Sequence, residues 1–400
     1  MTKFYKHIVD RLSYNLLALF AFDRLIKLAS VIHFFRRTPP PEPQSWPAVT
    51  LLQPITRGAS GLPGNLRSRA VLDYPGEIQH LFICDAGDSY AQAECAAVMA
   101  AFPSLQAELI LVETPGNGIA SGIASKIEKL VAALPHATGE VFCSIDDDIA
   151  LRPGALRTML PYLLQPGVGA VFGLACYTNW RNVWSSLMSA FVNINALLNY
   201  IPITYLTEPF TITGQCFALR RTTFESVGGF THMERRTDDD HELARRVRRC
   251  GLRNVQTPMI YDIDNHFSSR RGYEKQMKRW FIYPRQAMLP FMTPKERGFS
   301  FLVTVGQLIP ALLTLLVIFT LRRSALRALI ISLGIFGAVQ AVCELGYLQR
   351  GTPIRRWPLL PLMAILGPLH VLWALLTNEE IEWRGQRLRI HVGGETEVIA

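Results

Sequence analysis

The sequence predicts an α/β domain with membrane-spanning helices after it. Between residues 48 and 290, apolar strand-like runs alternate with helical patterns, and three long apolar stretches follow. Charged residues make up 18% of the 400 residues, below the roughly 25% of typical soluble proteins, and apolar residues make up 49%. This composition excludes an intrinsically disordered chain and indicates contact with a membrane.

The α/β prediction depends on the order of short segments in the first half of the chain. Four segments are strand-like, at residues 49–55, 78–84, 109–113 and 141–145. Three segments between them have helical patterns, at residues 66–72, 91–102 and 125–134. Such alternation predicts a mostly parallel sheet with helices on both faces. Ligands of such sheets bind at the carboxyl ends of the strands.

The two ends of the chain carry most of the apolar material. Residues 1–37 predict an N-terminal membrane anchor or interfacial helix, because Asp23, Arg24 and Lys27 interrupt an otherwise apolar stretch. Residues 38–47 form a Pro-rich linker, and residues 48–297 form the predicted catalytic domain. Residues 298–378 contain apolar runs at 298–321, 328–343 and 357–378 with basic flanks, which predict transmembrane or re-entrant helices. Residues 379–400 form a tail.

Acidic residues follow two of the predicted strands. Asp85 follows the second strand, and Asp146, Asp147 and Asp148 follow the fourth. A single Asp there would be explained as a turn residue or a helix N-cap. Three adjacent carboxylates need a counter-charge, for which a divalent cation is the usual choice. Asp146 and Asp148 point to the same side of an extended chain, so the spacing predicts Mg²⁺ or Mn²⁺ that also holds a diphosphate.

Two further groups of residues are candidates for catalysis or substrate binding. Asp239 and Asp240 open a helical stretch, where a carboxylate serves either the helix dipole or general-base catalysis. The basic helix after them, at residues 241–250, presents either a solvated face or a contact for anionic lipid. Gln276, Arg279 and Trp280 share one helix face by their spacing, which suits a phosphate and a sugar or acceptor ring, or simply a surface helix.

Several other functions are disfavoured by the sequence. The seven scattered cysteines form no ligand pattern, which argues against a disulfide scaffold or a zinc site. The glycine-rich stretch 116–122 follows the third strand and has the wrong glycine spacing for a dinucleotide loop. The formal charge is +9, but the basic residues lack the aromatic interleaving of a nucleic-acid surface, so no nucleic-acid partner is expected.

Taken in order, these segments resemble the family 2 glycosyltransferase superfamily, and most closely ceramide glucosyltransferases, which form glycosyltransferase family 21. The resemblance runs from about residue 49 to the end and is carried by LLQPITRGASGLPGNLRS (51–68), LDYPGE (72–77), ITGQCFALRRTTFESVGGF (212–230), QMKRW (276–280) and EWRGQRLRIHVGGETEVIA (382–400). It implies a Rossmann-like type A nucleotide-sugar transferase domain. It also implies an integral membrane protein with a cytosolic catalytic domain, in the inner membrane of a bacterium or the Golgi or ER of a eukaryote.

For the donor, the resemblance implies a UDP-sugar held at the carboxyl ends of the strands. Asp85 matches the residue that binds the uridine, and Lys126 matches a lysine of the nucleotide-side loop. Asp146 and Asp148 match the carboxylates that hold the metal and the diphosphate. The implied cofactor is Mg²⁺ or Mn²⁺.

For the acceptor, the resemblance implies inverting transfer of a sugar, glucose first, to the hydroxyl of a ceramide-like lipid in the bilayer. Asp240, with Asp239 beside it, matches the base that takes the acceptor's proton. Gln276, Arg279 and Trp280 match the group that closes the acceptor side and holds the leaving diphosphate.

The sequence departs from the family's pattern at two points that concern the acceptor. Asp239 stands where the family usually has Glu, and a usual His is missing from the segment at residues 198–202. A hopanoid, sterol or diacylglycerol acceptor therefore stays open, as do another UDP-sugar, a processive polysaccharide synthase and a degenerate scaffold. If all three C-terminal segments crossed the membrane, the tail would lie on the opposite side of the membrane from the catalytic domain. We therefore expect segment 298–321 or 357–378 to be re-entrant or interfacial.

Overall fold

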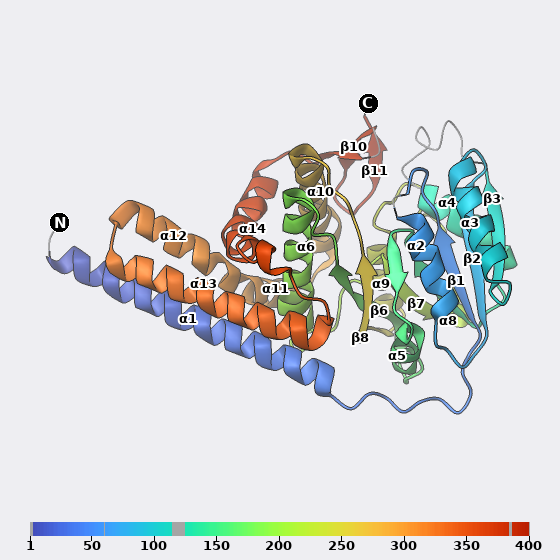
Figure 1. Ribbon diagram of the computed structural model, residues 1–400, viewed down its shortest axis with the longest axis horizontal. Helices are drawn as coiled ribbons and strands as arrows, with labels where there is room; N and C mark the ends of the chain where they lie inside the picture. Colours follow the sequence, from blue (N-terminus) through green and yellow to red (C-terminus); the bar gives the residue numbers. More distant parts are fainter. Residues whose placement is uncertain (1–2, 60, 114–124, 384–385, 400) are drawn as a thin grey trace.

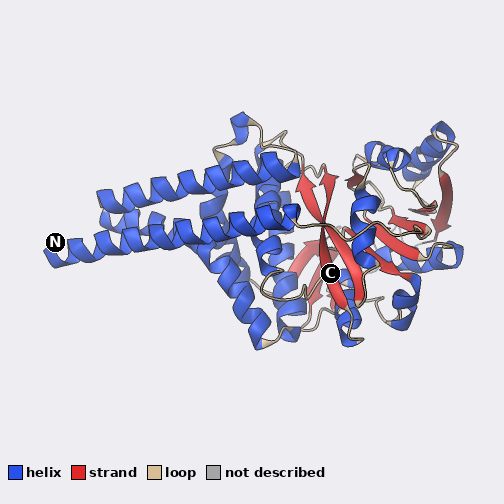
Figure 2. Cartoon of the chain, turned by 90° about the horizontal axis from the view of Figure 1, so that it is seen from below, coloured by secondary structure: helices blue, strands red, loops and turns tan. Residues whose placement is uncertain are grey.

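The computed structural model describes residues 3–59, 61–113, 125–383 and 386–399, so the glycine-rich stretch 116–122 lies outside the described residues. A sheet-containing half and a helical half lie end to end (Figure 1). Strands occupy one half, and long helices extend away from them (Figure 2). This arrangement confirms the predicted fold class of an α/β domain combined with long apolar helices.

The sheet has eight strands in the order β3-β2-β1-β4-β7-β6-β8-β5. Their bounds are β1 Val49–Pro54, β2 Ile78–Asp85, β3 Gln106–Val112, β4 Val141–Ile145, β5 Ile149–Leu151, β6 Val168–Tyr177, β7 Cys216–Arg220 and β8 Arg253–Ile263. The four predicted strands are β1 to β4, and they pair in parallel. β7 is antiparallel to both β4 and β6, so the second half of the sheet is mixed. The carboxyl ends of β1, β2 and β4 therefore share one edge.

Helices cover both faces of this sheet. Their bounds are α2 Leu62–Arg67, α3 Ser89–Ala101, α4 Ser125–Ala133, α5 Ala155–Leu163, α8 Arg221–Ser226 and α9 Asp239–Arg249. Side chains alternate along β2: Phe82 and Cys84 pack with α2 and α3, whereas Leu81 and Ile83 pack with α4 and α9. The helix predicted at 66–72 begins earlier, because Gly61 has φ 71° and a proline follows in the first turn, and its second half is a 3₁₀-helix.

The helical half consists of the remaining helices. Their bounds are α1 Lys3–Arg36, α6 Val183–Asn195, α7 Ile201–Ile203, α10 Arg270–Tyr283, α11 Pro294–Val305, α12 Ile309–Thr320, α13 Arg323–Cys343 and α14 Leu359–Leu376. Among the described residues, four helical segments are long and apolar enough to cross a membrane, at Val183–Ile203, Pro294–Thr320, Arg323–Leu348 and Ile354–Leu376. Within an 18-residue apolar window of each segment, 78% of the first is buried inside the protein, but only 22–44% of the other three. The chain is therefore a membrane protein.

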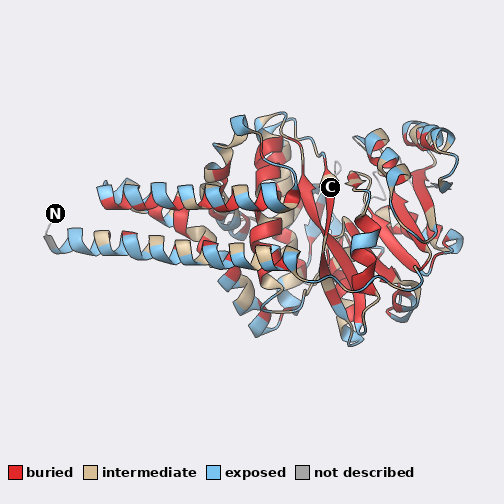
Figure 3. Ribbon diagram, turned by 60° about the horizontal axis from the view of Figure 1, so that its bottom comes forward, coloured by how far each residue is buried: buried red, intermediate tan, exposed pale blue. Residues whose placement is uncertain are grey.

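The N-terminal segment is one continuous helix of 34 residues that packs against α12 and α13. Several of its charged residues have partners inside this bundle: Asp10 pairs with Arg322 at 2.7 Å, and Lys27 lies 3.2 Å from Asp23 and donates to Val303 O. Its outer face is exposed (Figure 3), and many of the side chains on that face are large and apolar. The charges that interrupt the apolar pattern are thus compatible with a helix embedded in lipid.

Both ends of α14 contact the catalytic domain. Near its start, Arg356 Nε donates to Trp180 O at 3.1 Å. Near its end, Arg285 Nη1 donates to Ala374 O at 2.8 Å. A helix that crossed the bilayer would carry its two ends to opposite sides. We therefore expect α14 to lie along the membrane-facing side of the domain, as the interfacial alternative for residues 357–378 requires.

This arrangement gives a testable membrane topology. We expect a cysteine at the exposed position Val392, in a cysteine-free background, to be labelled by a membrane-impermeant maleimide from the side of the catalytic domain. Leu321→Cys, in the exposed turn between α12 and α13, is the matched control and should be labelled from the opposite side. Labelling of both positions from one side would refute this topology.

The segment after α14 folds as a small antiparallel sheet. Its strands are β9 Glu380–Trp383, β10 Gln386–Ile390 and β11 Thr396–Val398. Ile381, Leu388 and Ile390 form a buried cluster with Ile282 of α10. The tail is therefore packed on the catalytic domain.

Candidate functional site

Lys126 joins two of the predicted acidic clusters. It lies in the first turn of α4, and its ammonium group is 3.0 Å from Asp146 and 3.2 Å from Asp239. The same nitrogen donates to Gly214 O at 3.0 Å. The end of β4 and the start of α9 are thus held together by one cation, although 93 positions separate the two aspartates in the sequence.

The three carboxylates after β4 have different environments. Asp147 turns back into the protein, where its Oδ2 accepts from Thr56 N at 2.5 Å. Asp148 Oδ2 accepts from Asn265 Nδ2 at 2.9 Å, whereas its Oδ1 is buried without a hydrogen-bond partner among the described residues. The structure therefore assigns Asp147 to the support of the loop after β1 and leaves Asp146 and Asp148 facing the site.

Burial and mutual repulsion make these two carboxylates hard to ionise. Burial, with Asp146 and Asp147 as further causes, raises the pKa of Asp148 to about 7. Burial also raises the pKa of Asp146, although Lys126 opposes the shift. Added positive charge at this point would favour the ionised form of both groups.

The residues present fit a divalent cation that is shared with a substrate. In the described part of the chain, no group of three or more His, Cys, Asp or Glu side chains forms a self-contained metal site. Mg²⁺ typically keeps several waters and takes one or two carboxylates together with substrate phosphates. Asp146 and Asp148 supply that number of carboxylates, and the unpartnered Asp148 Oδ1 is a free ligand atom.

Asp240 lies in the first turn of α9, next to Asp239, which Lys126 joins to Asp146. Its Oδ2 accepts from Gly214 N at 2.8 Å, and its Oδ1 accepts from His241 N at 2.8 Å. Burial, followed by the neighbouring Asp239, raises its pKa to about 7. A Cβ at Gly214 would lie 2.8 Å from Asp240 Oδ2, so only glycine allows this approach. A carboxylate with this pKa is suited to accept a proton near neutral pH.

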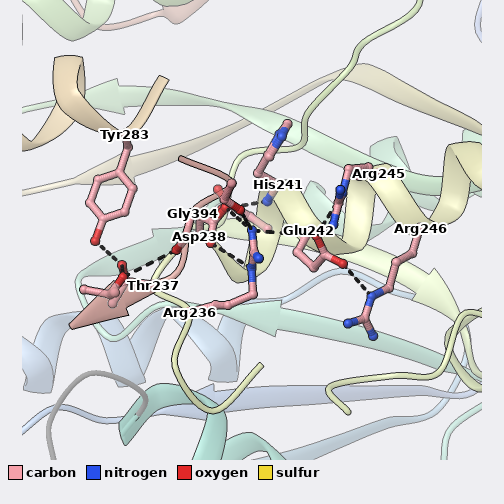
Figure 4. A network of polar contacts seen from close by, with 12 residues as sticks. Arg236, Thr237, Asp238, His241, Glu242, Arg245, Arg246, Tyr283 and Gly394 are labelled. Carbon is pink, nitrogen blue, oxygen red and sulfur yellow. Dashed lines mark hydrogen bonds and ion pairs between the residues drawn. The ribbon is translucent and has the colours of Figure 1, made fainter. Parts of the chain in front are cut away.

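The loop before Asp240 is held by the C-terminal tail. Arg236 donates to Asp238 at 2.8 and 3.1 Å and to Gly393 O at 2.7 Å (Figure 4). Thr237 hydrogen-bonds to Tyr283 of α10 and lies 3.3 Å from Thr396. The tail thus fixes the segment that leads into the base.

Gln276, Arg279 and Trp280 share one face of α10, as their spacing predicts. With its amide oriented by the hydrogen-bond network, Gln276 accepts from Trp280 Nε1 at 2.8 Å and from Arg279 Nη2 at 3.1 Å. Arg279 lies over the Trp383 ring of the tail at 5.6 Å. The Gln276 side chain therefore fixes the orientation of the other two.

Tyr177 connects Trp280 to the acidic pair. The ring centroids of Tyr177 and Trp280 are 6.2 Å apart. The Tyr177 hydroxyl accepts from Asn265 at 3.5 Å, and Asn265 donates to Asp148. Asp85 lies two strands away at the end of β2, where Arg57 and Lys129 pair with it at 3.2 and 3.5 Å.

The geometry adds residues that the sequence reasoning missed. Arg57 follows β1, so the rule that selected Asp85 could have selected it as well. Lys129 follows Lys126 by one helical turn and was detectable by that spacing. The roles of Arg236 and Asn265 carry no local signal, because each has a partner far away in the sequence, Gly393 of the tail and Asp148 of the loop after β4.

A comparison with known protein families decides the class of this chain. The model of "Glycosyl transferase family 21" matches residues 15–396. The chain belongs to glycosyltransferase family 21. The resemblance noted in the sequence is thereby confirmed, and the protein is a glycosyltransferase.

Other matches to this family 21 glycosyltransferase are more distant. The O-antigen biosynthesis protein RfbC of Myxococcus xanthus is 26% identical over 185 residues, which are 41% of this chain and only 14% of RfbC. A mannosyltransferase from Pyrobaculum calidifontis, PcManGT, solved with GDP-Man and Mn²⁺, is 19% identical with a TM-score of 0.49, covering 91% of this chain and 99% of its own. S. aureus TarS 1-349 is 12% identical with a TM-score of 0.38, over 88% and 99% of the two chains.

Proposed function

We propose that this glycosyltransferase moves a sugar from a UDP-sugar to the hydroxyl group of a membrane lipid, with glucose and a ceramide-like lipid as the first pair to test. The observation that carries the proposal is the position of Asp240, a half-buried carboxylate with a pKa of about 7, next to Asp239, which Lys126 joins to Asp146. The long apolar helices next to this site support a lipid acceptor. The catalytic domain then lies on the cytosolic face, where UDP-sugars are made.

The proposed reaction is a single in-line displacement. Asp240 accepts the proton of the acceptor hydroxyl, whose oxygen attacks the anomeric carbon while the bond from that carbon to the diphosphate oxygen breaks. The configuration at the anomeric carbon is thereby inverted. A divalent cation held by Asp146 and Asp148 would offset the charge on the departing diphosphate. Lys126 pairs with both Asp146 and Asp239 and so holds the end of β4 and the start of α9 together. The distance between the general base and the diphosphate site is thereby fixed.

The remaining predicted residues are proposed to contact the uridine and diphosphate of the donor and the acceptor lipid. Asp85 lies at the end of β2 and is proposed to hold the uridine, with Arg57 and Lys129 fixing its carboxylate. Arg279 is proposed to contact the leaving diphosphate, because a guanidinium group offers several donors to phosphate oxygens. Trp280 is proposed to form the wall of the site on the side where the acceptor binds.

Product analysis tests this proposal directly. Membranes that contain the protein are supplied separately with labelled UDP-glucose, UDP-galactose and UDP-N-acetylglucosamine, with Mg²⁺ or Mn²⁺, and lipids are extracted. We expect one labelled monoglycosyl lipid, whose mass names the donor and distinguishes a ceramide from a hopanoid, sterol or diacylglycerol. Label only in insoluble polymer would contradict the proposal and indicate a polysaccharide synthase.

The raised pKa of Asp240 predicts the pH dependence of transfer. The base must be ionised to accept a proton, and its pKa is about 7. At saturating Mn²⁺ and donor, kcat should therefore fall as pH decreases through 7, approaching about tenfold per pH unit on the acid side. Initial rates of glycolipid formation across this range test the prediction. A rate that stays flat below pH 7 would contradict the role of Asp240.

A further inference from the structure

A basic groove lies at the carboxyl end of α9, the end of that helix away from Asp240. Its volume is about 540 Å³, within the range of about 300–1,000 Å³ that is typical of ligand pockets. The charged side chains that line it, in the described part of the chain, are Glu208, Arg245, Arg248, Arg249 and Arg253. Four guanidinium groups against one carboxylate favour an anionic ligand.

Two of the four arginines are held in place by carboxylates. Arg245 Nε donates to Glu242 at 2.9 Å (Figure 4), and the same guanidinium lies 4.0 Å from the centre of the Phe291 ring. Arg248 pairs with Glu296 in the first turn of α11. Side chains that are already ordered lose less conformational entropy when a ligand binds. These contacts therefore form a fixed wall of the groove.

The other two arginines have no carboxylate partner among the described residues. Arg249 is exposed, and Arg253 is exposed and donates to Pro166 O at 3.2 Å. Glu208 offsets one of these two charges, so the groove keeps a net positive charge and unused N–H donors. Guanidinium N–H groups bind phosphate oxygens in pairs, which makes a phosphate group the anion that this lining suits best.

The groove lies at the height expected for lipid headgroups. Residues 298–321 carry no charge, so the apolar part of α11 begins directly after its first turn. The exposed Phe301 follows Glu296 by five residues, which is about 7.5 Å along the helix axis. The headgroup layer of a bilayer is about 5–8 Å thick on each side. Arg248, which pairs with Glu296, is therefore placed at this layer when Phe301 contacts the acyl chains.

We propose that this groove binds the phosphate group of an anionic membrane phospholipid, such as phosphatidylglycerol. Arg249 and Arg253 donate to the phosphate oxygens, and the exposed Phe291 contacts the glycerol part of the lipid. This lipid is a ligand in addition to the two substrates, because the groove and Asp240 lie at opposite ends of α9. Of the two interpretations of the basic helix at residues 241–250, the groove favours the contact for anionic lipid. The bound lipid would connect α9, which carries the proposed base, to α11.

Calorimetric titration of the detergent-solubilised full chain with dioctanoyl-phosphatidylglycerol tests the proposal. The double variant Arg249→Gln/Arg253→Gln should raise the dissociation constant at least about tenfold. The matched control, Arg67→Gln/Arg355→Gln, removes the same charge from two exposed positions outside the groove and should bind the lipid as the wild type does. Equal weakening in both double variants would overturn the proposal, because net charge rather than the groove would then determine binding.

A single variant guards against misfolding, since Arg253 also donates to Pro166 O. Arg249→Glu reverses the charge of an exposed side chain, so the thermal unfolding midpoint without lipid should match that of the wild type. We expect its dissociation constant for dioctanoyl-phosphatidylglycerol to rise by at least about tenfold. Binding as tight as in the wild type, in this variant and in the double variant, would overturn the proposal.

Two further ligands distinguish a lipid from a free phosphate. Dioctanoyl-phosphatidylcholine, whose choline offsets the phosphate charge, should bind at least about tenfold more weakly than the phosphatidylglycerol. Glycerol 3-phosphate, which has no acyl chains, should bind at least about a hundredfold more weakly. If glycerol 3-phosphate bound as tightly as the lipid, the groove would serve a soluble anion and the proposal would be wrong. No sugar transfer is measured, so the result does not depend on the proposed donor or acceptor.

Discussion

Asp240→Asn should abolish sugar transfer while UDP-sugar binding survives. The amide retains one oxygen that can accept from Gly214 N or His241 N, so the local fold persists, but it cannot take a proton from the acceptor. Loss of a general base typically costs about 10²–10⁴-fold, and we expect kcat to fall by at least about 10³-fold. Glycolipid formation and equilibrium UDP-sugar binding, measured on the same preparation, test both halves of the prediction.

The control for this variant is the same substitution at an exposed site. Asp73 has a side chain that is 65% exposed and belongs to no part of the site. Asp73→Asn should keep wild-type transfer and binding. Loss of UDP-sugar binding in Asp240→Asn would show that this carboxylate serves the donor rather than the acceptor.

Asp148→Asn should weaken donor binding in a metal-dependent way. The substitution removes a negative charge and the unpartnered oxygen that we assign to the cation. Even indirect supports of metal ligands typically contribute 10–100-fold to affinity, so we expect the UDP dissociation constant in Mn²⁺ to rise by at least about a hundredfold. Titration calorimetry with UDP, in Mn²⁺ and in EDTA, measures this effect.

Chelation supplies the internal control. In EDTA the wild type should bind UDP as weakly as Asp148→Asn does, because both then lack the bridging cation. A difference between them that persists in EDTA would show that Asp148 contacts the nucleotide without a metal. Comparable loss of UDP binding in Asp148→Asn and Asp240→Asn would mean that the two roles are wrongly divided.

The acidic half of the site was predictable because its signal is local. Asp85 and Asp146 each follow a buried apolar strand, and parallel strands bring their carboxyl ends to one edge without any knowledge of distant contacts. The position of Lys126 between Asp146 and Asp239 was not predictable from spacing. It depends on β7 inserting antiparallel beside β4, which brings Gly214 and α9 to the same edge.

In the helical half, contacts between distant positions of the sequence limited what could be predicted. Hydropathy identified the apolar runs after residue 298, but it treated the charges of the first helix as interruptions. Lys27, one of these interruptions, donates to Val303 O across 276 positions of sequence, which no local window detects. The same holds for the tail, whose hydrogen bonds to Arg236 span 157 positions. Long-range pairing of this kind decides whether a buried charge is tolerated.

The contact between the tail and the base loop also has a consequence for biosynthesis. The loop at residues 236–238 is translated before α12, α13 and α14, whereas the turn between β10 and β11 that accepts its hydrogen bond is translated after them. A nascent chain can therefore complete its catalytic loop only after the apolar helices have been synthesised. A chain that is cut short before the tail would lack the contacts that fix the residues leading into Asp240.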